Sequence, residues 1–150
     1  MMNKLLMLAV CASLIHTEYV PPDRPPLIEY KTLQNTYTTE ELDLIYRVVE
    51  TETYTADVES KSHVASVVFN MLNDPEQKFG KSVKSVIKAR GRFAYARKRI
   101  SPSTKEAVHK AFLKNTAPDC YAFHSGRRTS SFAGYEYSFT DKVGHHFYED

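Results

Sequence analysis

Residues 38–72 read TTEELDLIYRVVETETYTADVESKSHVASVVFNML and contain two segments with helical hydrophobic spacing. The first segment opens on a capping box, because Thr38 precedes Glu41 by three residues, and we expect a helix to begin there. Its apolar positions share one helical face: Leu42, Ile45, Val48 and Val49. We expect this helix to end between residues 50 and 53, with a polar loop over residues 54–58.

The second segment predicts a core helix over residues 59–73. Its apolar stripe consists of Val64, Val67, Val68, Met71 and Leu72. Asn73-Asp74-Pro75 ends it, because the residue before a proline disfavours the helical conformation. We expect two shorter helices over residues 82–89 and 104–113. Their inward positions are Val83, Val86 and Ile87 in the first, and Val108, Ala111 and Phe112 in the second.

The chain changes character after residue 115. Residues 120–124, 134–139 and 146–148 are short, rich in aromatic side chains and separated by Gly, Ser and Thr, which favours strands. A chain of 150 residues is one domain by length and can bury a sizeable core. We therefore predict an α+β domain, mainly helical, with a small irregular β portion near the C-terminus.

The N-terminus has the pattern of an export segment. A positively charged start precedes about 11 apolar or small residues, from Leu5 to Ile15, which suits a signal peptide and is short for a bilayer span. We predict that residues 1–17 are a signal peptide or hydrophobic export segment, with an uncleaved anchor as the alternative. Residues 18–29 contain four prolines, which favour an extended chain, so we predict that they form a linker. We expect the folded domain to cover residues 30–150. Removal of the segment would leave Cys120 without a disulfide partner.

Charge is distributed unevenly along the chain. Residues 1–60 contain four basic and ten acidic side chains, whereas residues 81–130 contain thirteen and two. A basic face suits a polyanionic partner such as a cell-wall polymer or a nucleic acid, although many of these side chains can simply be solvated. The sequence shows neither the metal-ligand cluster nor the catalytic pair of histidines that a nuclease would use.

Glu50 and Glu52 stand at the end of the first predicted helix, directly before the loop. Carboxylates at that end oppose the helix dipole and therefore need a reason to be there. Partial burial would raise the pKa of such a Glu toward working pH and make it a general acid. The alternative is that both are solvated residues at a helix end.

Several segments, in order along the chain, resemble the SleB-type cell wall hydrolases, which include spore-cortex-lytic enzymes. The segments are residues 48–52, 64–70, 92–94, 122–123 and 143–148. The resemblance covers roughly residues 40–148. It implies a lysozyme-like α+β fold and cleavage of the glycosidic bond after N-acetylmuramic acid in peptidoglycan.

The resemblance also implies a catalytic Glu at the end of the first helix, and Glu50 matches that position. Members commonly read Glu-Ala-Arg-Gly-Glu where this chain has Glu50 to Tyr54, and the loop that follows is about two residues longer, so Glu52 is the alternative. A glycosidase usually has a second carboxylate about 5 to 10 Å away. Of Glu52, Asp57 and Glu59, none has a decisive spacing, which favours a single Glu acting as acid and then as base. We expect Glu50→Gln to abolish clearing of peptidoglycan and Glu52→Gln to lower it less.

The predicted substrate-binding residues are aromatic or lie in the resembling segments: Phe93, Tyr121, Phe123, Tyr135, Tyr137 and His146. Aromatic rings stack on sugars, although about half of the tyrosines and phenylalanines of the strand segments should be core. Adjacent side chains on a strand point to opposite faces, so His145 and His146 do not suit one metal ion. We expect neither a metal nor another cofactor.

Three classes of function remain open. The first is a peptidoglycan glycosidase, either a lytic transglycosylase or a muramidase. The second is a noncatalytic wall-binding or structural protein on the same fold, and the third is a secreted nucleic-acid binder or nuclease. We expect the first class: a secreted or envelope-associated monomer without a transmembrane helix in its mature form, which binds glycan strands and not nucleic acid.

Overall fold

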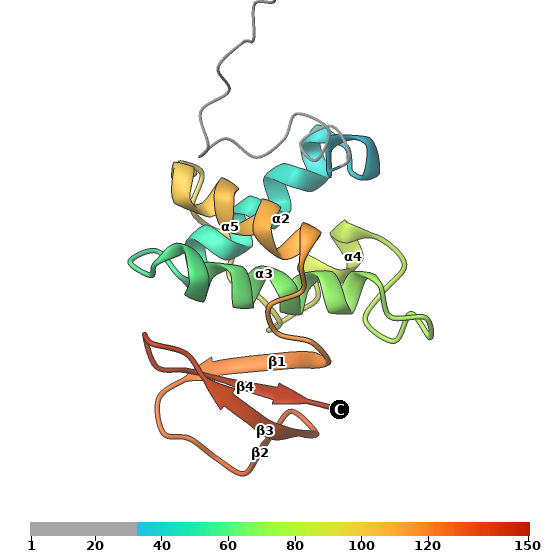
Figure 1. Cartoon of the computed structure of the whole chain (residues 1–150). Helices are drawn as coiled ribbons and strands as arrows, with labels where there is room; N and C mark the ends of the chain where they lie inside the picture. The colour runs from blue at the N-terminus through green and yellow to red at the C-terminus, as the bar shows by residue number, and fades with distance from the viewer. Residues whose placement is uncertain (1–32) are drawn as a thin grey trace, which may run out of the picture.

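Residues 33–150 are described by the computed structural model, and the expected export segment and linker lie outside them. The described chain has two layers, with helices α2 to α5 on one side and an antiparallel sheet on the other (Figure 1). The mainly helical α+β fold with a small sheet at the C-terminus is therefore confirmed. Between residues 33 and 150, no helix combines the length and the apolar character that a membrane span requires.

Helix α2 (Thr39–Glu52) begins at the predicted capping box. The Glu41 N–H donates to Thr38 Oγ1 over 3.2 Å, and the Thr38 N–H donates to Glu41 Oε2 over 2.9 Å. The predicted apolar face is buried: Leu42, Ile45, Val48 and Val49. The start, end and inward face of this helix were predictable because a cap and a periodic stripe occur together.

Helix α3 (Val58–Leu72) lies between the other helices and the sheet, where it contacts α5 and the first strand. Asp57 caps it by accepting a hydrogen bond from the Ser60 N–H over 2.8 Å. The positions of the predicted stripe are buried except Leu72, which is half-buried. The predicted core helix is confirmed.

Helices α4 (Val83–Ile87) and α5 (Pro102–Leu113) complete the helical layer. Helix α5 begins two residues before the expected start, because Pro102 occupies its first turn and Ser101 caps it. Proline is well tolerated there, since the first N–H groups of a helix have no intrahelical acceptor.

The sheet contains β1 (Cys120–Ser125), β2 (Ser131–Phe132), β3 (Tyr135–Thr140) and β4 (His145–Glu149). The strands are antiparallel and lie in the order β1-β4-β3-β2. The three predicted strands are confirmed. Strand β2 was not predicted, because two residues are too few to show an alternating pattern.

The two faces of the sheet carry different aromatic clusters. Phe139 and Phe147 stack at 4.7 Å on the inner face, where His63 of α3 packs edge-on against both rings. On the outer face Tyr148 is also fully buried, stacked on His124 at 5.3 Å. Both faces of β4 therefore contribute to packing, so the sheet does not have one buried apolar face and one solvated polar face.

Candidate active site

Glu50 is buried, with only 1% of its surface exposed. Its Oε2 accepts hydrogen bonds from Thr104 Oγ1 at 2.5 Å, from Ser101 Oγ at 2.7 Å and from the Ser101 N–H at 3.1 Å. These donors belong to the first turn of α5 and its cap. The carboxylate therefore ties the end of α2 to the start of α5.

A buried lysine completes this cluster. Lys61 Nζ lies 3.8 Å from Glu50 Oε2, and each side chain is 2% exposed. The ammonium donates to the hydroxyls of Ser101, Ser103 and Thr104 over 3.1, 3.0 and 3.0 Å. An ammonium has three protons, so these three acceptors use all of them. The ion pair thus links α2, α3 and α5 inside the protein.

The pKa of Glu50 differs from the expectation. Burial by itself raises it, but the hydrogen bonds from Thr104 and Ser101, together with the charge of Lys61, outweigh burial and hold the pKa below its ordinary value of 4.5. The expected raised pKa is wrong, because the sequence shows neither the lysine partner nor the hydroxyl donors near this carboxylate. The lowered pKa favours the carboxylate form of Glu50, as its hydrogen-bond donors and the Lys61 ammonium require. Its catalytic role stays a prediction that this geometry does not favour.

Glu52 lies in a different environment, at the last residue of α2, and is partly exposed. Its Oε1 accepts a hydrogen bond from the Ala94 N–H over 2.6 Å. The neighbouring Thr51 Oγ1 accepts one from the Arg97 N–H over 3.0 Å. The segment 94–101 is thereby held against the end of α2, and Glu52 remains at the surface beside Phe93.

A cavity of ≈ 490 Å³ lies between α3, β1, the 90–93 loop and the turn before β3. Four of the six predicted substrate-binding residues line it: Phe93, Tyr121, Phe123 and Tyr135. Val67 and Met71 of α3 contribute apolar surface. The structure therefore brings these four residues together, although they come from distant parts of the chain.

The aromatic rings of the cavity form two stacks. In one, Tyr121 lies between Phe79 at 5.4 Å and Tyr135 at 5.7 Å. In the other, Phe93 stacks on Phe123 at 6.4 Å, and Phe123 stacks on the buried Phe147 at 5.8 Å. Phe93 and Tyr135 end their stacks, and each has one face without another aromatic ring among the described residues.

Tyr137 and His146 do not line this cavity. Tyr137 is directly opposite Tyr148 in the ladder, and side chains of such a pair share a face. His146 precedes Tyr148 by two residues and therefore points to that outer face as well. There a hydrogen bond of 2.7 Å joins His146 Nδ1 and Thr140 Oγ1, and His146 Nε2 donates to Gly126 O over 2.8 Å.

His145 points the other way and pairs with Asp141 at 3.0 Å. The prediction that the adjacent histidines face opposite sides is confirmed. Within residues 33–150 no cluster of three His, Cys, Asp or Glu side chains is arranged to hold a metal ion.

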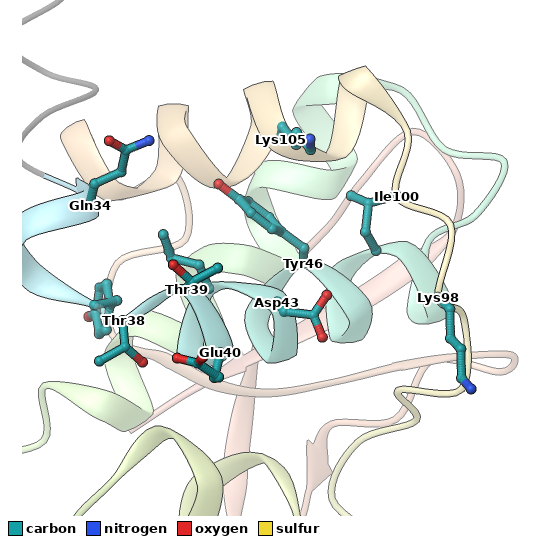
Figure 2. Close-up of a pocket in the computed structure, with 11 residues that line it drawn as sticks. Gln34, Thr38, Thr39, Glu40, Asp43, Tyr46, Lys98, Ile100 and Lys105 are labelled. Carbon is teal, nitrogen blue, oxygen red and sulfur yellow. The ribbon is translucent and has the colours of Figure 1, made fainter.

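A larger cavity of ≈ 930 Å³ lies elsewhere, between α2, α5 and residues 98–100. Figure 2 shows Asp43 and Tyr46 on α2 and Lys105 on α5 along its wall. Tyr37 and Tyr46 also line it, but it contains none of the predicted site residues, four of which line the smaller cavity. We therefore place the candidate site at Glu52 and the smaller cavity.

The other candidate carboxylates are engaged with one lysine. Lys142 Nζ lies 3.7 Å from Asp57 and 3.0 Å from Glu59. Hydrogen bonds from Ser60 lower the pKa of Asp57, and the hydrogen bond from Lys142 lowers the pKa of Glu59. No carboxylate lines the aromatic cavity among the described residues, and Glu52 adjoins it only through its hydrogen bond to the Ala94 N–H, next to Phe93.

A model of the cell wall hydrolase family matches residues 55–149, more than half of the chain. The chain belongs to the cell wall hydrolase family. Neither a curated protein nor a solved structure matches it. Membership identifies this protein as a hydrolase that acts on peptidoglycan, outside the cytoplasm. The matched residues include the lining of the aromatic cavity and begin after Glu50 and Glu52.

The sequence analysis did not single out two residues that lie at Glu50 and at the cavity of this cell wall hydrolase: Lys61 and Arg90. Lys61 lies about one helical turn before Val64 and two turns before Val68, on the same buried face of α3. A lysine in that register predicts a buried partner, because an unpaired ammonium is costly to bury. Arg90 at the cavity wall had no distinguishing signal among the many basic residues of its segment.

Proposed function

We propose that this cell wall hydrolase is a SleB-type glycosidase that cleaves the bond after N-acetylmuramic acid, with Glu52 as its single acid and base. The observation that carries this proposal is the position of Glu52: it is partly exposed, at the end of α2, and bound to the backbone beside Phe93 of the aromatic cavity. Glu50, in contrast, serves as the anion of a buried ion pair.

The reaction needs two proton transfers. Glu52 gives its proton to the bridging oxygen as the bond from that oxygen to the sugar C1 breaks. The resulting carboxylate then takes a proton from the nucleophile that bonds to C1. If the nucleophile is the 6-hydroxyl of the same sugar, an anhydro end forms and the enzyme is a lytic transglycosylase. If it is water, a reducing end forms and the enzyme is a muramidase.

The arrangement around Glu52 suits this role. The Ala94 N–H binds Oε1, and no described residue forms a hydrogen bond with Oε2, which leaves that oxygen for the substrate. Asp57 and Glu59 are held by Lys142, which supports a mechanism with one carboxylate.

The cavity supplies the binding surface for the glycan strand. Phe93 and Tyr135 line the cavity and are partly exposed, and sugar rings pack against aromatic rings through their C–H groups. Burial raises the pKa of the Tyr121 hydroxyl, so it remains a neutral donor for an N-acetyl or hydroxyl group. Tyr137 and His146 lie on the outer sheet face and have no part in this surface.

Mass spectrometry of the fragments released from purified peptidoglycan tests the proposal. We expect fragments cut at the glycosidic bond after N-acetylmuramic acid, and anhydro or reducing ends identify the nucleophile. Fragments cut only within the stem peptide would show that the protein acts on amide bonds and would refute the proposal.

Binding without cleavage is the second candidate function. It is favoured by the residues that follow Glu50, which depart from the Glu-Ala-Arg-Gly-Glu pattern of the family that the chain resembles. A wild-type protein that sediments with peptidoglycan and releases no fragment would select this alternative.

We also propose a lysozyme-like arrangement for the catalytic domain, residues 30–150, acting as a monomer without a cofactor. Residues 1–17 direct export and residues 18–29 link that segment to the domain. Secretion follows from this organisation and agrees with a substrate that lies outside the cytoplasm.

A further inference from the structure

The aromatic cavity has an unbalanced charge. Two arginines, Arg90 and Arg92, lie in its wall on either side of Gly91, and no acidic residue is among the described residues that line it. Positive charge without a compensating carboxylate attracts an anion, especially beside apolar walls that weaken solvent screening. The two arginines are not equivalent, however.

Arg92 is committed to the protein itself. Its guanidinium donates to Phe79 O over 2.7 Å and to Val86 O over 2.9 Å. It also lies over the Phe79 ring, 5.5 Å from the centroid. These contacts fix the loop after α4 and support the ring stack of the cavity, so the Arg92 side chain is structural.

Arg90 is exposed and forms no hydrogen bond, ion pair or ring contact with any residue from 33 to 150. Gly91 turns the chain between the two arginines with a φ of +73°, a conformation that favours glycine. No atom lies within 4 Å of the position that a Cβ on Gly91 would occupy, so the turn is open to a ligand. Arg90 is therefore the available cation of the cavity.

We propose that Arg90 binds a carboxylate carried by the muramyl residue of the strand and so selects peptidoglycan over uncharged N-acetylglucosamine polymers. This inference rests on the proposed function, because it assumes that the glycan occupies the aromatic cavity. The planar guanidinium of arginine pairs with a carboxylate through two parallel hydrogen bonds. The carboxylate belongs either to the stem peptide or, on strands without stems, to the lactyl group.

The test compares Arg90→Ala with Arg99→Ala on native peptidoglycan and on peptidoglycan whose carboxylates have been converted to amides. Arg99 is a matched control, because it is also exposed, lies in the same basic segment and does not line the cavity. It reports any general loss of attraction between a basic protein and an anionic polymer.

We expect Arg90→Ala to lower kcat/KM on native peptidoglycan about tenfold, the effect of losing one charge-assisted hydrogen-bonded contact. Amidation should lower the rate of wild type and Arg99→Ala by a similar factor and should leave Arg90→Ala unchanged. Arg90→Lys should recover part of the rate, because it restores the charge without the planar fork.

Strands stripped of stem peptides identify the source of the carboxylate. On intact strands the lactyl carboxyl is bonded to the stem as an amide, so a defect confined to intact strands assigns a stem carboxylate. A defect that also occurs on stripped strands shows that Arg90 binds the freed lactyl carboxylate there. Equal rates for Arg90→Ala and Arg99→Ala on native peptidoglycan would overturn the inference while leaving the proposed function in place. A wild-type protein that cleaves no glycan would overturn both.

Discussion

Replacing Glu50 by Gln tests whether this residue is structural. The change keeps the size of the side chain but removes its charge, so the Lys61 ammonium stays buried without its anion. Removing one partner of a buried ion pair costs about 3 to 5 kcal/mol. Three hydroxyls still accept from Lys61, which favours the lower end, and we expect a loss of about 3 kcal/mol in the free energy of unfolding.

Urea and thermal denaturation measure this loss. For a domain of this size, about 3 kcal/mol corresponds to a fall in Tm of about 10 °C. Glu52→Gln is the matched control, because Glu52 is partly exposed and its amide oxygen can still accept from Ala94. We expect it to change the free energy of unfolding by less than about 0.5 kcal/mol.

The ion pair also predicts a pH dependence. The pKa of Glu50 is lowered in the folded protein, so its contribution to stability is present above the ordinary value of 4.5 and is lost as pH falls through the folded value. Wild type should therefore lose stability below about pH 4.5 more steeply than Glu50→Gln. An unfolding free energy of Glu50→Gln within about 0.5 kcal/mol of wild type at pH 7 would refute the buried-pair interpretation.

Three other changes probe the cavity and the core. Arg92→Ala should lower the free energy of unfolding by about 2 kcal/mol in urea denaturation, because two carbonyls lose a charged donor; a value near zero would show that the loop does not depend on this contact. Phe93→Ala should raise KM for peptidoglycan about tenfold in turbidity assays, with a smaller effect on kcat. An unchanged KM would show that the glycan does not contact this ring. Burial raises the pKa of Cys120 to about 11. In a Cys11→Ser protein, the Cys120 thiol should therefore react with iodoacetamide at pH 8 only after denaturation. Rapid labelling of the native protein would contradict the burial of this thiol.

The helices and strands could be predicted because their signals are local. A capping box and an apolar stripe defined α2, and aromatic segments between small residues defined β1, β3 and β4. The burial of Glu50 could not be predicted in the same way, because its partners come from α3 and α5, about 10 and 50 residues further along the chain.

The candidate site could be predicted only in part, because its geometry also depends on contacts between distant segments of the chain. The sequence selected four aromatic residues that meet in one cavity, but it could not separate them from Tyr137 and His146, which the strand pairing directs to the outer face. The sequence also ranked Glu50 above Glu52, the reverse of our proposal, because it does not show the partners of either carboxylate. That choice depends on exposure and partners: one carboxylate has a lysine and three hydroxyl or amide donors, and the other has a single backbone donor at the surface.

The most direct test of the central claim is the release of glycan fragments by Glu52→Gln, measured by mass spectrometry beside wild type on the same purified peptidoglycan. The assay should follow a check that the variant unfolds at the wild-type urea concentration, so that only the chemistry differs. We predict that wild type releases fragments ending in N-acetylmuramic acid and that folded Glu52→Gln releases them at least about 100-fold more slowly. Wild-type rates of release by Glu52→Gln would contradict the assignment of Glu52 as the acid.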